Sequence, residues 1–218
     1  MIDPEDLAAI EREGRRIIEL ARAKPGAHTR QYPTWTLADL VVHLGGVHGR
    51  TAEVCRSLPT GRIPTPTPDP GVDPVDWAEA QLAQMLEALA AADPGAEVWT
   101  FVADRRLAFW APRMVIETGV HRWDAEGAVG EPAPLLGIVA THGLDEFSAL
   151  YLPRLGDLPT LGLRATDLDR RWRYGSGRAS TVVEGTASEL FLRLMSRPGV
   201  ALPEAWARAV DALARPTR

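Results

Sequence analysis

Cysteine pairs, excess positive charge and long apolar runs are all missing from this sequence. Cys55 is the only cysteine, so no disulfide bond can form within the chain, which fits a reducing cytoplasm. No uninterrupted apolar stretch approaches the ~18 residues of a membrane-spanning helix. The acidic segment 1–6 also differs from the basic start of a signal peptide. We therefore expect a cytoplasmic protein without a membrane partner.

The lack of excess positive charge argues against a nucleic-acid partner, because the formal net charge is −5 and nucleic acids are bound by basic surfaces. Familiar enzyme motifs are missing too. The sequence has no Gly-x-Gly-x-x-Gly, no phosphate-binding loop and no His-Glu-x-x-His, and the turn at 175–177 lacks the spacing of a nucleophile elbow. Cys55 lies beside an apolar helical stripe, where a free cysteine usually acts as a small hydrophobic residue rather than a nucleophile.

What is present is an ordinary globular composition. The 218 residues are 45% hydrophobic and 24% charged, which is enough for one large domain or two small ones. Apolar residues recur with the helical period in four segments separated by loops, which predicts an antiparallel four-helix bundle. The predicted helices span 4–23, 36–58, 74–92 and 107–127, and the buried face of the second includes Leu58.

Two linking segments are rich in helix-breaking residues. The segment 59–74 holds six prolines in sixteen residues, which predicts an extended loop that is either a flexible excursion or a wall over a pocket. The segment 127–134 is rich in glycine and proline, as is typical of a domain boundary. We therefore divide the chain into a helical domain, residues 1–130, and a second domain, residues 131–218.

The second domain mixes helical and alternating patterns, which makes the fold class of the chain α+β. Its last two strands are joined by the turn Gly175-Ser-Gly177. We expect helices at 135–152, 187–196 and 203–213, and strands at 161–166, 171–174 and 180–184.

Glu117 and His121 are the first candidates for chemistry. They lie four residues apart in a helical segment, so they share one face and can hold a divalent metal ion together. A third ligand could come from the second helix, where His43 and His48 lie about 140° apart around the axis; the pattern does not choose between them. Asp124 could orient the imidazole of His121 by accepting a hydrogen bond.

Each of these candidates also has a structural interpretation. Glu117 can pair with Arg113 or Arg122, leaving His121 as a hydrogen-bonded core histidine, and spacing alone favours this more common arrangement. Asp124 can equally form a salt bridge with Arg122 or a neighbour. Apolar residues around Glu117 indicate a partly buried position, and a buried carboxylate needs a partner.

The same spacing occurs once more, at His142 and Glu146. There the sequence predicts an exposed helix pair rather than a metal site. Trp35, Trp110 and Trp123 are expected in the core or in a pocket wall rather than against a cofactor.

Two segments resemble the signatures of one family. The run Trp35-Thr-Leu-Ala-Asp-Leu-Val-Val-His43 resembles the Trp-x-x-x-Asp-Leu-x-x-His signature of mycothiol-dependent maleylpyruvate isomerases and their DinB-like relatives. The run Glu117-Thr-Gly-Val-His121-Arg-Trp-Asp124 is similar to the Glu-x-x-x-His-Arg-x-Asp stretch that ends their bundle. The resemblance implies a DinB-like four-helix bundle followed by a small α+β C-terminal domain. It also implies a divalent metal ion, usually zinc, held by His43, Glu117 and His121.

The resemblance continues into the C-terminal domain, through Leu-Arg-Ala-Thr-Asp167 and Val-Glu-Gly-Thr-Ala187. In the family, a functional arginine follows the leucine-rich helix. Arg197 is the nearest match here, although the motif around it departs from the family pattern. The resemblance thus implies that Arg197 is catalytic, whereas a purely structural arginine there would complement the dipole at the end of a helix.

The function implied is that of a metal-dependent enzyme whose partners are a low-molecular-weight thiol such as mycothiol and a small-molecule electrophile. The metal-bound thiolate would attack the electrophile, with Arg197 holding a carboxylate of the substrate, in an isomerase or a thiol S-transferase. Two alternatives stay open at this point. One is a non-catalytic metal-binding or ligand-binding module, and the other is a hydrolase that uses metal-activated water.

Overall fold

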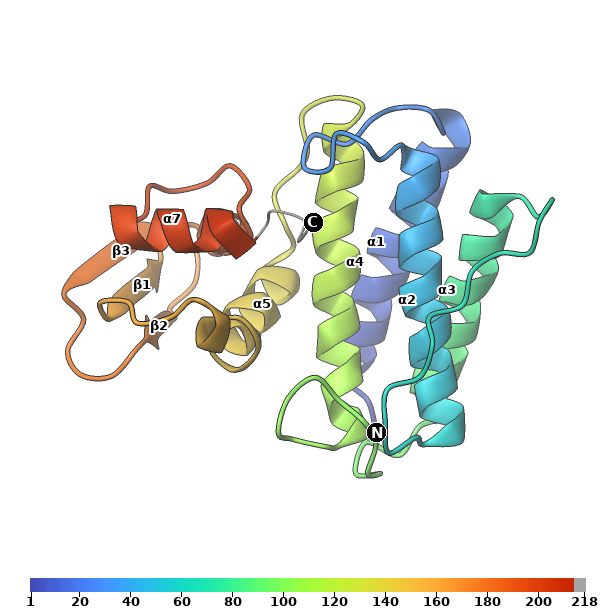
Figure 1. The fold of residues 1–218 in the computed structure, drawn as a ribbon, viewed down its shortest axis with the longest axis horizontal. Coiled ribbons are helices and arrows are strands. Elements are labelled where there is room, and N and C mark those ends of the chain that lie inside the picture. Colours follow the sequence, from blue (N-terminus) through green and yellow to red (C-terminus); the bar gives the residue numbers. More distant parts are fainter. Residues whose placement is uncertain (214–218) are drawn as a thin grey trace. The chain divides into compact units, whose positions relative to one another are not determined.

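The computed structural model describes residues 1–213, which form two compact units, one over 1–133 and one from residue 134 onward. The first unit is helical, and the second combines helices with a small sheet (Figure 1). The predicted α+β class is therefore confirmed. None of the described helices is long and apolar enough to cross a lipid bilayer.

The helical unit is a bundle of four helices that lie side by side (Figure 1). Helix α2 packs mainly against α3, and α1 against α4, with further contacts between α1 and α3 and between α2 and α4. The fourth predicted helix begins with one 3-10 turn, Leu107–Phe109, before it becomes α-helical. The helices are α1 (Pro4–Ala23), α2 (Leu37–Ser57), α3 (Pro74–Ala91) and α4 (Trp110–Gly127).

Side-chain caps fix where α1, α2 and α3 begin. Asp3 accepts from the backbone of α1 and Asp73 from that of α3. Thr36 and Asp39 form a reciprocal capping box at the start of α2. The end of α2 differs from the prediction: Leu58 is 44% exposed, because it caps the helix with a left-handed backbone (φ 48°) and leaves the apolar face.

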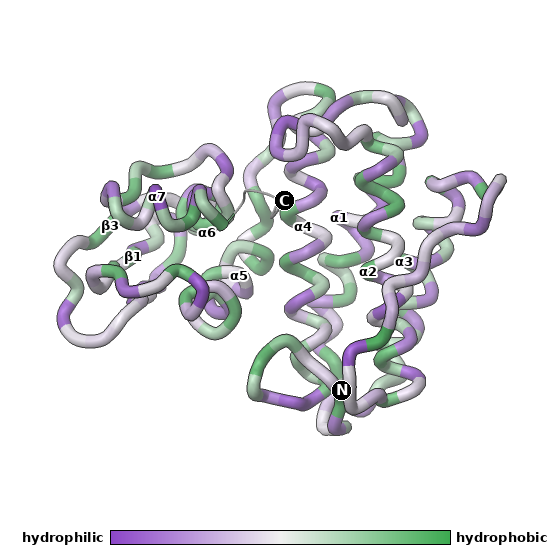
Figure 2. Tube along the Cα trace, in the orientation of Figure 1, coloured by the Kyte–Doolittle hydropathy of each residue, from purple (hydrophilic) through white to green (hydrophobic). Residues whose placement is uncertain are grey.

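Buried apolar residues of the four helices form one core cluster, and hydrophobic and hydrophilic residues alternate along each helix of the bundle (Figure 2). One buried ion pair crosses this interior. Nε of Arg122 on α4 lies 2.7 Å from Oε2 of Glu13 on α1, and both side chains are almost fully buried. Arg122 also contacts Glu126 at 2.8 Å, so the pair belongs to a network.

The proline-rich loop after α2 lies against the bundle. A methyl group built on Gly46 would come within 2.7 Å of Thr65 Cγ2 and 2.9 Å of the Pro66 carbonyl oxygen. Glycine at this position therefore lets the loop press onto α2, because any side chain would push it away. The loop forms a wall along the helix at this level.

The second unit holds a three-stranded sheet in the order β2-β1-β3. The central strand β1 pairs antiparallel with β2 and parallel with β3. The turn 175–177 thus leads the chain past β1 to the opposite edge, so the two strands that it joins are not neighbours. The elements are α5 (Gly137–Leu150), a 3-10 turn (Leu152–Arg154), β1 (Leu161–Ala165), β2 (Arg171–Tyr174), β3 (Thr181–Gly185), α6 (Ala187–Leu194) and α7 (Glu204–Leu213).

Aromatic residues build the core of this unit. Phe147, Tyr174, Phe191 and Trp206 are almost fully buried, and the hydroxyl of Tyr174 donates to the Leu144 carbonyl oxygen at 2.6 Å. Such burial of large rings supplies most of the stabilisation available to a small domain.

Candidate metal centre

Helices α2 and α4 bring three potential ligands together. His43 comes from α2, and Glu117 and His121 come from successive turns of α4. Nε2 of His43 lies 3.3 Å from Oε1 of Glu117, and Nε2 of His121 lies 3.5 Å from the same oxygen. One ligand atom from each residue lies within 4.8 Å of the other two. The three donors therefore converge on a single point.

The spacing of these donors fits a divalent ion such as zinc. Zinc lies about 2.0–2.1 Å from a histidine nitrogen and about 2.0–2.2 Å from a carboxylate oxygen, so two ligands at the tetrahedral angle are about 3.4 Å apart. The two nitrogen–oxygen separations, 3.3 and 3.5 Å, are close to that value. Two histidines and one carboxylate would leave one coordination position open.

The opening of the site lies at His43. Its side chain is 35% exposed, compared with 21% for Glu117 and 8% for His121. Trp35 packs against His43 with ring centroids 5.1 Å apart, and Tyr32 packs against Trp35 at 4.8 Å. An incoming small molecule would therefore meet His43 and its aromatic neighbours first.

Arg113 holds the outer oxygen of Glu117. Its Nη2 lies 2.6 Å from Oε2 of Glu117, one turn along α4. Burial alone would raise the pKa of Glu117. The contacts with His121 and His43, together with the charge of Arg113, outweigh burial and lower the pKa well below its usual value. Glu117 is therefore a carboxylate with one oxygen paired to an arginine and the other facing two imidazoles.

Asp124 contacts His121 from the other side of the ring. Oδ2 of Asp124 lies 3.1 Å from Nδ1 of His121, and both side chains are buried. Burial lowers the pKa of His121, but the contacts with Asp124 and Glu117 reverse this and raise the pKa to about 9. A carboxylate on Nδ1 leaves Nε2 as the nitrogen that faces the convergence point.

His48 is excluded from this cluster by its own contact. Its Nε2 lies 3.0 Å from Oγ1 of Thr118, and the residue is 2% exposed. Burial lowers the pKa of His48 to about 3, so the ring is neutral. Of the two histidines that the sequence left open, the structure brings only His43 to Glu117 and His121.

The other sequence candidates lie elsewhere. His142 and Glu146 on α5 are half-buried, so the expectation of an exposed pair is wrong. Cys55 is half-buried too, and burial raises the pKa of its thiol to about 12, which makes it a poor nucleophile at neutral pH. Trp110 and Trp123 lie in the core of the bundle, as expected.

Arg197 follows α6 and is 4% exposed. Its backbone N–H donates to the Leu192 carbonyl oxygen at 2.9 Å and its Nη1 to the Met195 carbonyl oxygen at 2.8 Å. These contacts satisfy carbonyl groups at the end of α6, as the dipole interpretation anticipates. A catalytic role for Arg197 stays a prediction.

Two features of the site had no distinct signal in the sequence. Tyr32 lies in an irregular loop with no periodic pattern. Arg122, the other partner considered for Glu117, is engaged by Glu13, a residue 109 positions away in the chain. Local spacing carries no information about such a distant contact.

Comparison with known proteins gives a consistent result. A family model described as the mycothiol maleylpyruvate isomerase N-terminal domain matches residues 7–126. Two solved structures, of a mycothiol-dependent maleylpyruvate isomerase and of a histidine-to-alanine mutant of that enzyme, each match with a TM-score of 0.69 and 16% identity, over 92% of this chain and 94% of theirs. At this identity, the structural match shows a shared fold. A search of curated proteins gives no match.

Proposed function

Because the chain belongs to the family of the mycothiol maleylpyruvate isomerase N-terminal domain, whose model matches over half of its length, we propose that it is a metal-dependent enzyme that uses a low-molecular-weight thiol. The thiol is of the mycothiol type, and it attacks an electrophilic carbon of a small molecule. The observation that carries this proposal is the convergence of His43, Glu117 and His121 at separations that suit zinc. These three residues would hold the ion.

A divalent ion in this site would supply Lewis acidity, lowering the pKa of a thiol in the open position so that the reactive thiolate prevails at neutral pH. The protein prepares the site for this task. Asp124 fixes the orientation of His121, and Arg113 fixes that of Glu117. Trp35 packs against the ring of His43 at the opening of the site.

The same thiolate can serve two reactions. In an isomerisation it adds to a conjugated double bond, the former double bond rotates as a single bond, and the carbon–sulfur bond breaks again to regenerate the thiol. In a transfer the carbon–sulfur bond remains, and the carbanion left by addition takes up a proton. We propose Arg197 as the residue of the C-terminal unit that holds a carboxylate of the substrate in either case.

Metal content provides the first test. The untagged protein is purified, reconstituted with zinc and analysed by mass spectrometry. We expect about one ion per chain, because three preorganised ligands bind zinc tightly. Less than about one-tenth of an ion per chain after reconstitution would exclude the site as proposed.

Thiol dependence provides the second test. The zinc-loaded protein is incubated with an activated alkene, with and without mycothiol, and loss of the alkene and formation of a thioether are followed. We expect turnover only with the thiol. Turnover that is indifferent to thiol would instead indicate metal-activated water. Zinc binding without any turnover would indicate a binding module.

A further inference from the structure

Arg50 is a buried cation whose set of partners is incomplete. It lies on α2 and is 7% exposed. Nη1 donates to Oγ1 of Thr65 at 3.0 Å, and the guanidinium lies 5.6 Å from the ring centre of Phe101. Nε is buried and has no hydrogen-bond partner. Within residues 1–213, no carboxylate forms an ion pair with Arg50.

An arginine in this situation is costly to the fold. A buried charge without a counter-ion loses its hydration and gains little in return. Thr65 and the ring of Phe101 compensate only in part, because neither carries a negative charge. The partner that would compensate this positive charge is therefore an anion.

Helix geometry directs Arg50 towards the metal centre. Seven residues separate it from His43, which is about 700° of rotation, so both leave the same face of α2. Long side chains on a helix lean towards its N-terminus, which is the direction of His43. The guanidinium donates to Thr65, and Thr65 lies against Gly46. The side chain of Arg50 therefore extends along α2 to the level of Gly46. Gly46 is three residues from His43, about 4.5 Å along the axis.

The facing helix places a second arginine at the same level. Thr51 contacts the sulfur of Met114 at 3.2 Å, which sets Arg50 opposite the turn of α4 that carries Arg113. The carboxylate of Glu117 already pairs with Arg113, so Arg50 is a surplus positive charge. Burial, followed by the charge of Arg62, lowers the pKa of Arg50, while Glu117 opposes the shift.

We propose that Arg50 anchors a carboxylate group of the small molecule that reacts at the metal centre. With Nη1 engaged by Thr65, the edge formed by Nε and Nη2 is the one that can grip a carboxylate with two parallel hydrogen bonds. The electrophile is then an acid whose carboxylate lies within a few bonds of the carbon that the thiol attacks. Binding of an anion at Arg50 does not depend on which reaction the protein catalyses. The statement about the electrophile, in contrast, rests on the proposed function.

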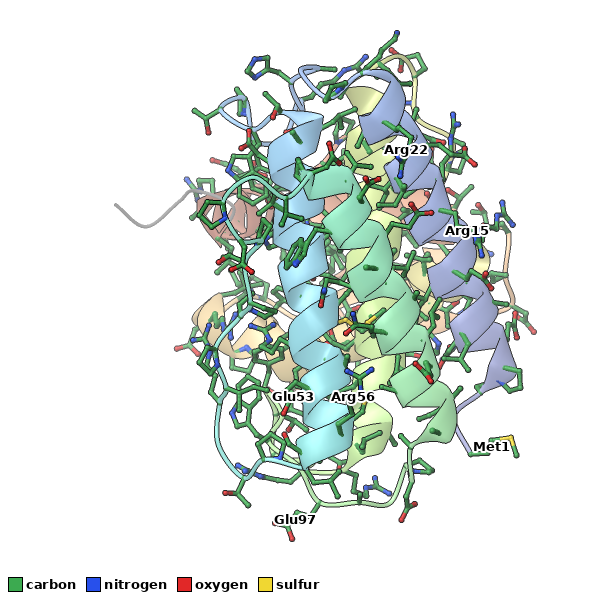
Figure 3. The ribbon with its side chains drawn as sticks, turned by 90° about the vertical axis from the view of Figure 1, so that its right-hand side faces the viewer. Met1, Arg15, Arg22, Glu53, Arg56 and Glu97 are labelled. Atoms are coloured by element: carbon green, nitrogen blue, oxygen red, sulfur yellow. The ribbon has the colours of Figure 1, made fainter. Side chains whose placement is uncertain are left out.

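Direct binding tests the site without any turnover. Zinc-loaded protein without thiol is titrated with succinate by calorimetry, and with its neutral diamide as a control. The variants are Arg50→Gln, which removes the charge, and Arg50→Lys, which keeps the charge but loses the paired donors. Arg56→Gln is the matched control, because Arg56 lies on the outer surface of the same helix (Figure 3).

We expect succinate to bind and the diamide not to bind. Arg50→Gln should lower the affinity for succinate at least tenfold, and Arg50→Lys should lower it less. Arg56→Gln should leave this affinity unchanged. Wild-type affinity in Arg50→Gln would overturn the proposal. Absence of succinate binding to the wild type up to about 50 mM would overturn it as well.

A second measurement does not depend on a folded variant. The buried Nε–H of Arg50 gives its own signal in a ¹⁵N-resolved spectrum of the wild-type protein. We expect this signal to move as succinate is added. A signal that stays in place while backbone signals elsewhere respond would place the anion at another site and overturn the proposal.

Kinetics separate this inference from the proposed function. If thiol-dependent turnover exists, Arg50→Gln should raise KM for a carboxylate-bearing alkene about tenfold more than KM for its neutral amide. Equal changes in the two KM values would overturn the anchor. If the protein shows no thiol chemistry but succinate binding depends on Arg50, the proposed function fails and the anion site stands.

Discussion

Asp124 lies against the imidazole of His121 on the side opposite Glu117, with Oδ2 3.1 Å from Nδ1. A carboxylate in this position fixes the ring and makes the far nitrogen a better ligand. We predict that Asp124→Asn, which keeps the shape of the side chain, weakens zinc binding by about 10- to 100-fold. Competition with a chromogenic chelator measures the affinity.

Glu126→Gln on the same helix is the matched control for this prediction. Glu126 pairs with Arg122 and Arg16 rather than with a proposed ligand. Its substitution should leave zinc affinity within about twofold of the wild type, because it contributes no contact to the imidazole. Equal losses of affinity in the two variants would show that Asp124 acts through the stability of α4 instead.

The two histidines of α2 should respond differently to removal. His43→Ala deletes a proposed ligand whose side chain is 35% exposed, so we expect zinc below about one-tenth of an ion per chain and an almost unchanged fold. His48→Ala removes a buried ring that pairs with Thr118. It should keep its zinc but lose about 1–3 kcal/mol of unfolding free energy.

Mass spectrometry and urea unfolding of both variants check this pair of expectations. If zinc is lost from His48→Ala and retained by His43→Ala, the choice of ligand is reversed. If both variants keep their zinc, neither histidine of α2 binds the ion together with Glu117 and His121.

Much of the bundle could be predicted from local sequence because its signals are local. The cap at Thr36 and the apolar period after it define α2 within two residues. The left-handed end at Leu58 was missed, because it depends on the backbone leaving the helix rather than on hydropathy. The candidate ligands could be named from spacing and resemblance, whereas the anion site at Arg50 depends on Thr65 and Phe101, two loop residues with no periodic pattern.

The sheet shows the same limit. Alternation predicts the three strands closely, but the turn at 175–177 does not determine whether the strands it joins pair with each other. In the structure β1 lies between them. Strand order depends on which buried faces complete the core, and that is a property of distant contacts rather than of turn residues.

The buried pair between Glu13 and Arg122 should be costly to break. Glu13→Ala leaves a guanidinium that is 5% exposed without one of its partners. Glu126 still neutralises part of that charge, so we expect a loss of about 3 kcal/mol, at the lower end for broken buried pairs. Urea unfolding at neutral pH measures the loss.

Glu11→Ala provides the matched control on the same helix. Glu11 pairs with Arg15 at 2.6 Å, but the pair is exposed, with Arg15 on the outer surface of α1 (Figure 3). Its removal should change the unfolding free energy by no more than about 0.5 kcal/mol. Similar losses in the two variants would mean that burial does not determine the strength of these pairs.

The capping box of α2 should make the unfolding free energy of the protein depend measurably on pH. Asp39 accepts hydrogen bonds from the hydroxyl and the backbone N–H of Thr36, and these contacts lower the pKa of Asp39 below its usual value. Because the folded pKa is depressed, the stabilisation is fully present above the unfolded pKa of about 3.9. It is lost as the pH falls through the folded pKa.

We therefore predict that Asp39→Ala is about 1 kcal/mol less stable than the wild type at pH 7. The difference should start to shrink below about pH 4, where Asp39 becomes protonated in the unfolded chain, and it should go on shrinking until the folded carboxylate is protonated too. Urea unfolding of both proteins across this pH range measures the difference. A gap that stays constant down to pH 2 would mean that Asp39 stabilises α2 through its shape rather than its charge, since protonation would then have no effect on the box.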